Sequence, residues 1–247
     1  MISMTEIANK EQKYSFQNII SLGHFCAPAM QLEKYGFRRA SYPFDWLIIR
    51  DFRLVLYLIQ NGYSDTDFLE PSCFAQAKKK KMYYQNVKTK VRFLHDFDAF
   101  RSFEQQWDDF SNKYTRRMLR FQRDISTPTL FIRYIGSKEE LCFISNNIDS
   151  IDLMIKEKCA QNEILYVCDS NLKPEIDIYV TQTEDGKVNF AFMENPDKGL
   201  LDWLRMNYTN ELSFHKHKKS KISQFISKIK SLVISPYQHE QTYGDLD

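Results

Sequence analysis

Short apolar runs alternate along the chain with segments in which apolar residues recur every three or four positions. The runs predict strands, and the three-to-four spacing predicts helices. The predicted strands end near residues 22, 94, 135 and 168, and the predicted helices cover 27–35, 47–61, 100–123 and 136 to about 159. The strands at 129–135 and 163–168 are almost wholly apolar, which is typical of strands that are covered on both faces.

The order of these elements predicts an α/β fold. We expect a layered, mainly parallel sheet flanked by helices, closed by an antiparallel hairpin at 176–181 and 187–193 and by a last core helix at 197–208. The alternative is a papain-like α+β fold. Three parts are expected: a polar leader at 1–15, a single α/β domain at 16–210 and a basic tail at 211–247.

The tail combines a lysine- and histidine-rich stretch with apolar residues at helical spacing. This pattern, at 215–233, predicts a basic amphipathic helix. Such a helix suits an anionic membrane surface or the groove of a partner, and it can also dock on its own domain. We therefore expect either a cytoplasmic protein or one that contacts a membrane peripherally.

Composition narrows the classes of function. The chain has 247 residues, a hydrophobic content of 43% and a net charge of +2, so it can bury a real core and shows no overall preference for nucleic acid. Five cysteines without a C-x-x-C pair predict reduced thiols in the cytosol and no structural zinc site. No cofactor is expected. No apolar run reaches the roughly 20 residues that span a bilayer.

Cys26 is the first candidate for chemistry. A strand, a turn at Gly23 and a helix from Ala27 place it at or beside a helix N-terminus. Free backbone N–H groups and the helix dipole stabilise a thiolate there, so we expect a depressed thiol pKa. The alternative is that Cys26 is a small buried residue beneath the first helical turn.

Two further positions carry charged groups at the ends of predicted strands. His95 and Asp96 follow the strand that ends at Leu94, where α/β proteins often place reactive groups. Arg133 interrupts the apolar strand at 129–135. A charged residue there is either paired or directed into a cleft, so Arg133 could neutralise a substrate carboxylate or pair with Asp45.

Several motifs in order resemble a bacterial and viral family of unknown function, labelled putative papain-like cysteine peptidase. The motifs are S-L-G-x-x-C-x-x-A-x-x-L at 21–32, S-x-P-F-D-W at 41–46, H-D-F at 95–97, Y-x-R-R-x-x-R-F at 114–121 and L-F-I-R at 130–133, with a glutamate at 139 or 140. The resemblance implies a thiol nucleophile at Cys26 and a histidine base at His95. Members of such families often accompany enzymes of polysaccharide biosynthesis.

The mechanism implied is acyl transfer on a peptide or a glycan-linked acyl substrate. His95 would take the thiol proton of Cys26, or hold it in a thiolate–imidazolium pair, and later protonate the leaving group. Either Asp45 or Asp96 would fix the imidazole tautomer. The candidate substrate-binding residues are Gly23, His24, Arg117, Arg133 and Glu139.

Two departures from the papain pattern leave other functions open. Cys26 has no flanking tryptophan, and no asparagine or aspartate stands out after His95. One alternative is an acyl hydrolase or transferase resembling the SGNH esterases and acting on glycans, although no histidine is preceded by the D-x-x of their motif. The other is a binding module without catalysis, attached to a membrane or partner by its basic tail.

Overall fold

The computed structural model describes residues 16–76, 83–98, 100–169, 172 and 189–193. The chain divides into two units, 1–214 and 215–247, and every described residue belongs to the first. The predicted leader, the first strand of the predicted closing hairpin, the helix at 197–208 and the amphipathic tail lie outside the described residues.

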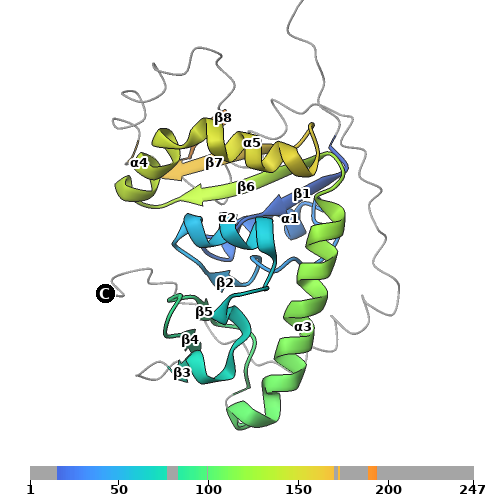
Figure 1. Cartoon of the computed structure of the whole chain (residues 1–247), viewed down its shortest axis with the longest axis vertical. Helices are drawn as coiled ribbons and strands as arrows, with labels where there is room; N and C mark the ends of the chain where they lie inside the picture. Colours follow the sequence, from blue (N-terminus) through green and yellow to red (C-terminus); the bar gives the residue numbers. More distant parts are fainter. Residues whose placement is uncertain (1–15, 77–82, 99, 170–171, 173–188, 194–247) are drawn as a thin grey trace, which may run out of the picture. The chain divides into compact units, whose positions relative to one another are not determined.

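A parallel sheet lies at the centre of the described unit (Figure 1). Its strands, in spatial order, are β1 (Asn18–Ser21), β6 (Thr129–Ile135), β7 (Glu163–Asp169) and β8 (Asn189–Met193). All three pairings are parallel. Every residue of β6 is buried, as its almost continuous apolar sequence predicts for a strand covered on both faces.

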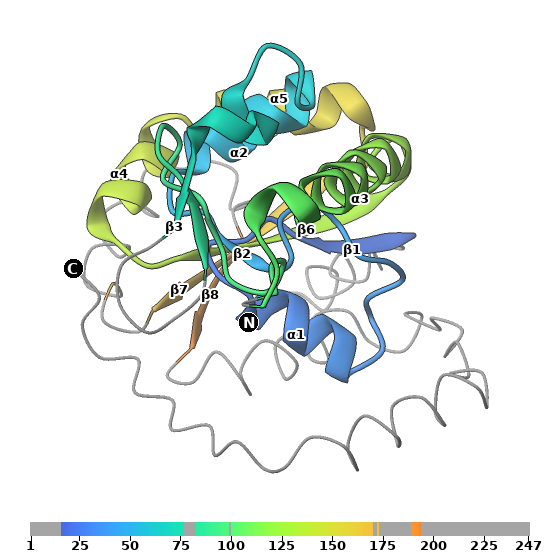
Figure 2. The same cartoon turned by 90° about the horizontal axis from the view of Figure 1, so that it is seen from below.

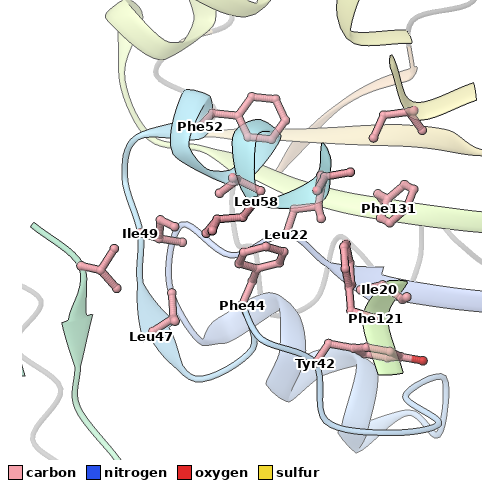
Figure 3. Packing of buried hydrophobic residues seen from close by; sticks show 14 of the residues in the cluster. Ile20, Leu22, Tyr42, Phe44, Leu47, Ile49, Phe52, Leu58, Phe121 and Phe131 are labelled. Atoms are coloured by element: carbon pink, nitrogen blue, oxygen red, sulfur yellow. The ribbon is translucent and has the colours of Figure 1, made fainter. Parts of the chain in front are cut away.

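Helices cover both faces of this sheet (Figure 2). On one face lies α1 (Ala27–Lys34), whose Leu32 packs with Ile19 and Leu130. The other face carries α2 (Phe52–Asn61), α3 (Phe103–Asp124), α4 (Lys138–Asn146) and α5 (Ile148–Lys158). The larger hydrophobic cluster fills that side, and Figure 3 shows its part between β1, β6 and α2. The two apolar clusters fix the sheet between its helices.

A second, antiparallel sheet comes from the middle of the chain. Its strands, in spatial order, are β2 (Leu47–Ile48), β5 (Arg92–Phe93), β4 (Tyr84–Asn86) and β3 (Phe74–Gln76). His24 forms an isolated antiparallel bridge with Ile49, just after β2. The loop that follows β1 therefore joins the parallel sheet to the antiparallel one.

Three sequence-based predictions are corrected by local interactions. Residues 47–61 are not one helix, because the side chain of Asp51 accepts a hydrogen bond from the Arg53 amide and begins α2 there. Residues 87–94 are not one strand, because the Asn86 side chain accepts from the amides of Lys88 and Thr89 and closes a turn. Residues 136–159 form two helices, with a break at Asn147.

The second strand of the predicted closing hairpin is present, whereas the first lies outside the described residues. Residues 189–193 form β8, which pairs with β7 in parallel. The described residues combine helices with one parallel and one antiparallel sheet, which is consistent with the predicted α/β class. The antiparallel strands among the described residues come from residues 47–93.

Candidate functional site

Cys26 is the N-cap residue of α1, as the sequence predicts. The preceding turn requires a glycine: Gly23 has φ +79°, and a Cβ there would lie 2.7 Å from Ile49 Cγ2 and 3.3 Å from the Phe44 carbonyl oxygen. The thiol is half-buried. Burial raises the pKa of Cys26 and outweighs the backbone hydrogen bond that lowers it. The direction is opposite to the predicted depression, because burial disfavours the thiolate.

His24 lies in the same loop, two residues before Cys26, and has the uncommon φ of +78°. Its Nδ1 is 3.3 Å from Glu140 Oε2, without the alignment of a regular hydrogen bond. The ring packs edge-on against Phe25 and Tyr134, with centroids 5.8 and 5.4 Å away. Side-chain packing and a carboxylate thus hold this imidazole at the carboxyl end of the parallel sheet.

Gly136, directly after β6, makes room for this ring. A Cβ at Gly136 would lie 2.8 Å from His24 Nε2 and 2.9 Å from Cε1. Any side chain at this position would therefore displace the imidazole or cover Nε2.

Arg133 is fully buried beneath the imidazole–carboxylate pair. Its Nε and Nη2 contact Glu140 Oε1 at 2.7 and 2.6 Å. The remaining donors reach the backbone carbonyls of Leu22, Ile49 and Arg50 at 2.9–3.1 Å. All five guanidinium N–H groups are therefore occupied. This contradicts both predicted roles for Arg133, because no donor is left for a substrate carboxylate and its partner is not Asp45.

Glu140, not Glu139, is the glutamate of this network. Both follow Ser137, whose side chain caps α4 by accepting a hydrogen bond from the Glu140 amide. Glu139 is exposed, whereas Glu140 is buried. The spacing of residues in α4 indicates which glutamate is buried. Glu140 lies four residues before the buried Ile144, so the two side chains share the inner face of the helix.

The two aspartates predicted to orient His95 have other partners. Asp45 is buried and accepts hydrogen bonds from Arg38 Nε at 2.9 Å and the Tyr42 amide at 2.8 Å. The Asp96 side chain pairs with Lys113 Nζ at 2.6 Å and accepts from the Tyr114 hydroxyl at 2.8 Å. Neither carboxylate makes a hydrogen bond or ion pair with His95 in the described part of the chain.

His95 itself is exposed, and its ring lies edge-on to Trp46 at 6.2 Å between centroids. Within the described ranges, no hydrogen bond joins His95 to Cys26. The two residues follow segments on opposite sides of β2, because His24 bridges Ile49 and Phe93 pairs with Leu47. Both segments therefore pair with residues 47–49, which brings the two residues to one region of the fold.

Arg117 lies on α3, away from the Cys26 loop. Its guanidinium packs over the Tyr114 ring at 5.0 Å, and its Nη1 is buried without a hydrogen-bond partner. A pocket of about 330 Å³ opens beside the same helix, with Asp96, Lys113 and Arg116 in its lining. Neither Cys26, His24 nor His95 lines this pocket.

All five cysteines are within the described residues, and all are free thiols. In the same part of the chain, no group of three His, Cys, Asp or Glu side chains is arranged to hold a metal ion. No helix of the described ranges is long and apolar enough to cross a membrane.

A known protein family matches the part of the chain that contains the candidate site. The family described as "Putative papain-like cysteine peptidase (DUF1796)" matches residues 17–166, which include Cys26, His95 and Glu140. An uncharacterized protein of Acanthamoeba polyphaga mimivirus is 33% identical over 119 residues, 41% of this chain and 53% of the viral protein. The chain thus spans about half the length of this curated relative.

No solved structure matches significantly. Because the match covers more than half of the sequence, the chain belongs to the family described as "Putative papain-like cysteine peptidase (DUF1796)".

Proposed function

We propose that this protein is a cysteine-dependent hydrolase that acts by acyl transfer through Cys26. The observation that carries the proposal is a half-exposed thiol at the N-terminus of α1, two residues from an imidazole that faces a buried carboxylate. Family membership supports a peptidase-like hydrolase. The carboxyl end of a parallel sheet, where these groups lie, is the usual place for an active site in α/β folds.

The direction of the Cys26 pKa supports one form of the mechanism. Burial raises this pKa, which disfavours a preformed thiolate–imidazolium pair. A histidine must instead take the proton as the sulfur attacks the substrate carbonyl. Backbone N–H groups of the first turn of α1 then stabilise the developing oxyanion.

The resemblance assigns the base to His95, with Asp45 or Asp96 to fix its tautomer. His95 is exposed and could approach the thiol by a side-chain rotation or on substrate binding, but both aspartates would have to leave their present partners. Peptides and glycan-linked acyl groups are the proposed substrates. Both present the carbonyl carbon that a thiol attacks.

Turnover of a panel of peptide amides and acyl-glycan esters tests the proposal, together with intact-mass detection of a thioester. Wild type is expected to hydrolyse at least one member and to carry an acyl group on Cys26 that hydroxylamine removes. Cys26→Ala should lose both signals. Cys142→Ala is the matched control, since Cys142 is also a half-buried free thiol. An acyl adduct that persists in Cys26→Ala, or that forms at Cys142 instead, would leave only a binding function.

A further inference from the structure

We propose that His24, and not His95, takes the thiol proton of Cys26, and that Glu140 is the positioning residue for its imidazole. The inference rests on the proposed hydrolase function and assigns its general base. The observation that suggests it is the buried chain of contacts from Arg133 through Glu140 to His24, which ends two residues from the candidate nucleophile.

The covalent chain keeps the Cα atoms of His24 and Cys26 close together. Two residues span at most about 7 Å even when fully extended. The loop is not extended, because His24 has φ +78° and Cys26 already has helical angles. His95 has no such constraint and belongs to a segment across β2. Because Phe25, Tyr134 and Glu140 hold the His24 ring, a rotation of the Cys26 side chain would close the remaining gap.

The carboxylate of Glu140 favours the tautomer that a base needs. A proton on Nδ1 would face Glu140 Oε2 3.3 Å away, although without the alignment of a regular hydrogen bond, and would leave the lone pair on Nε2. Glu140 is fixed in turn, because Arg133 holds its other oxygen. The carboxylate therefore cannot swing away from the imidazole without leaving a buried guanidinium unpaired.

Two backbone features indicate that the position of this ring is under constraint. A positive φ is uncommon for residues other than glycine, and such strained residues cluster at functional sites. Gly136 leaves open the space beside Nε2 that a Cβ would fill. The His24 side chain is 16% exposed, and Gly136 lets its Nε2 edge lie close to the backbone after β6.

The proposed acyl transfer and the hydrolysis that follows conserve atoms and charge. The Cys26 S–H proton moves to His24 Nε2 as the sulfur forms a bond to the substrate carbonyl carbon. The imidazolium then returns this proton to the leaving amine or alcohol as the C–N or C–O bond breaks, which gives a thioester. Water, deprotonated by the same imidazole, hydrolyses the thioester and restores the thiol.

The test measures acetylation of Cys26 by p-nitrophenyl acetate in the full chain, read by peptide mass spectrometry across pH. Two variants remove the imidazole while tolerating the positive φ: His24→Asn and His24→Gly. We expect each to acetylate Cys26 about a hundredfold more slowly than wild type and to lose the acid-side inflection of the pH profile. Added imidazole should restore the rate in His24→Gly, which a merely structural role would not allow.

His95→Asn separates the two histidines. The inference requires that this variant keep the acid-side inflection and gain nothing from added imidazole. If His95→Asn loses the inflection while both His24 variants keep it, His95 is the base and the inference is overturned, although the proposed hydrolase stands. If Cys26 is not acetylated in wild type, the proposed function itself fails.

Glu140→Gln tests the positioning role, with Glu139→Gln on the exposed side of α4 as its matched control. Charged or titratable groups of β6, α4 and the loop surround His24: Arg133, Tyr134, Glu140 and Cys26. Only Glu140 among them is an anion that favours imidazolium. Glu140→Gln should therefore move the inflection to lower pH and slow acetylation, while Glu139→Gln should do neither. An unmoved inflection in Glu140→Gln would refute the positioning role.

Discussion

At the scale of single residues, Asp45 shows how burial sets the charge of the region around the candidate site. Removal from water raises the pKa of Asp45 to about 6, although Arg38 and the Tyr42 amide oppose the shift through hydrogen bonds. Arg117 opposes it from α3. The folded protein therefore binds a proton at Asp45 in a pH range where the unfolded chain has already released it.

The stability of the protein should report this shift. An unfolded Asp titrates near about 3.9, so the free energy of unfolding falls between about pH 4 and pH 6 and is level above that range. The contribution of Asp45 is about 3 kcal/mol, fully present below pH 4 and lost above pH 6. Urea unfolding at several pH values should show this decline in wild type and a flatter profile in Asp45→Asn. Parallel profiles would mean that Asp45 is ionised throughout.

Residue types alone could not assign partners in this region. The sequence offered Asp45 as the partner of either Arg133 or His95, yet Arg38, seven residues away in the same turn, is closest to it. Likewise Glu139 and Glu140 are equivalent as residue types, and only the inward face of α4 distinguishes them. Pairings of this kind depend on which faces meet after the chain has folded.

At the scale of elements, Arg133 links its own strand, β6, to three other segments. Its donors reach Leu22 directly after β1, Ile49 and Arg50 in the β2–α2 connection, and Glu140 of α4. Each of these carbonyls would be left without its partner if the guanidinium were removed, and Glu140 would be a buried anion without its counter-charge.

We predict that Arg133→Met lowers the free energy of unfolding by about 3–5 kcal/mol, the range for breaking a buried ion pair. Chemical denaturation measures the change. Arg116→Met is the control, since Arg116 is exposed on α3 and should change stability by less than about 0.5 kcal/mol. Adding Glu140→Gln to Arg133→Met should recover part of the loss by removing the orphaned charge. An equal, small effect of both arginine substitutions would contradict the linking role.

Periodicity predicted the long elements well and the short ones badly. The strand at 129–135 and the helix near 100–123 have enough apolar positions to determine their type and approximate bounds. The two-residue strands β2 and β5 do not, because their conformation is fixed by the Asp51 cap, the Asn86 turn and pairing with each other. Side-chain to backbone hydrogen bonds set these boundaries, and hydrophobic spacing does not detect them.

At the scale of the whole described unit, the candidate site depends on both sheets. The loop after β1 supplies Cys26 and His24, and the bridge to Ile49 attaches that loop to the antiparallel strands. The sequence placed Cys26 at the start of a helix correctly. It could not show that burial would raise the pKa of the thiol or that Glu140 would face His24, because both follow from packing between distant segments.

The reactivity of Cys26 relative to the other half-buried cysteines tests the central claim most directly. Folded wild type would be exposed briefly to limiting iodoacetamide at pH 7, and the modified fraction of each cysteine would be read by peptide mass spectrometry. Cys142 and Cys159 are internal references, since they fall in the same class of burial as Cys26. The account predicts that Cys26 reacts at least about tenfold faster, because a neighbouring histidine takes the thiol proton as the sulfur attacks and so offsets the raised pKa. A rate at Cys26 equal to or below that of both references would contradict the account.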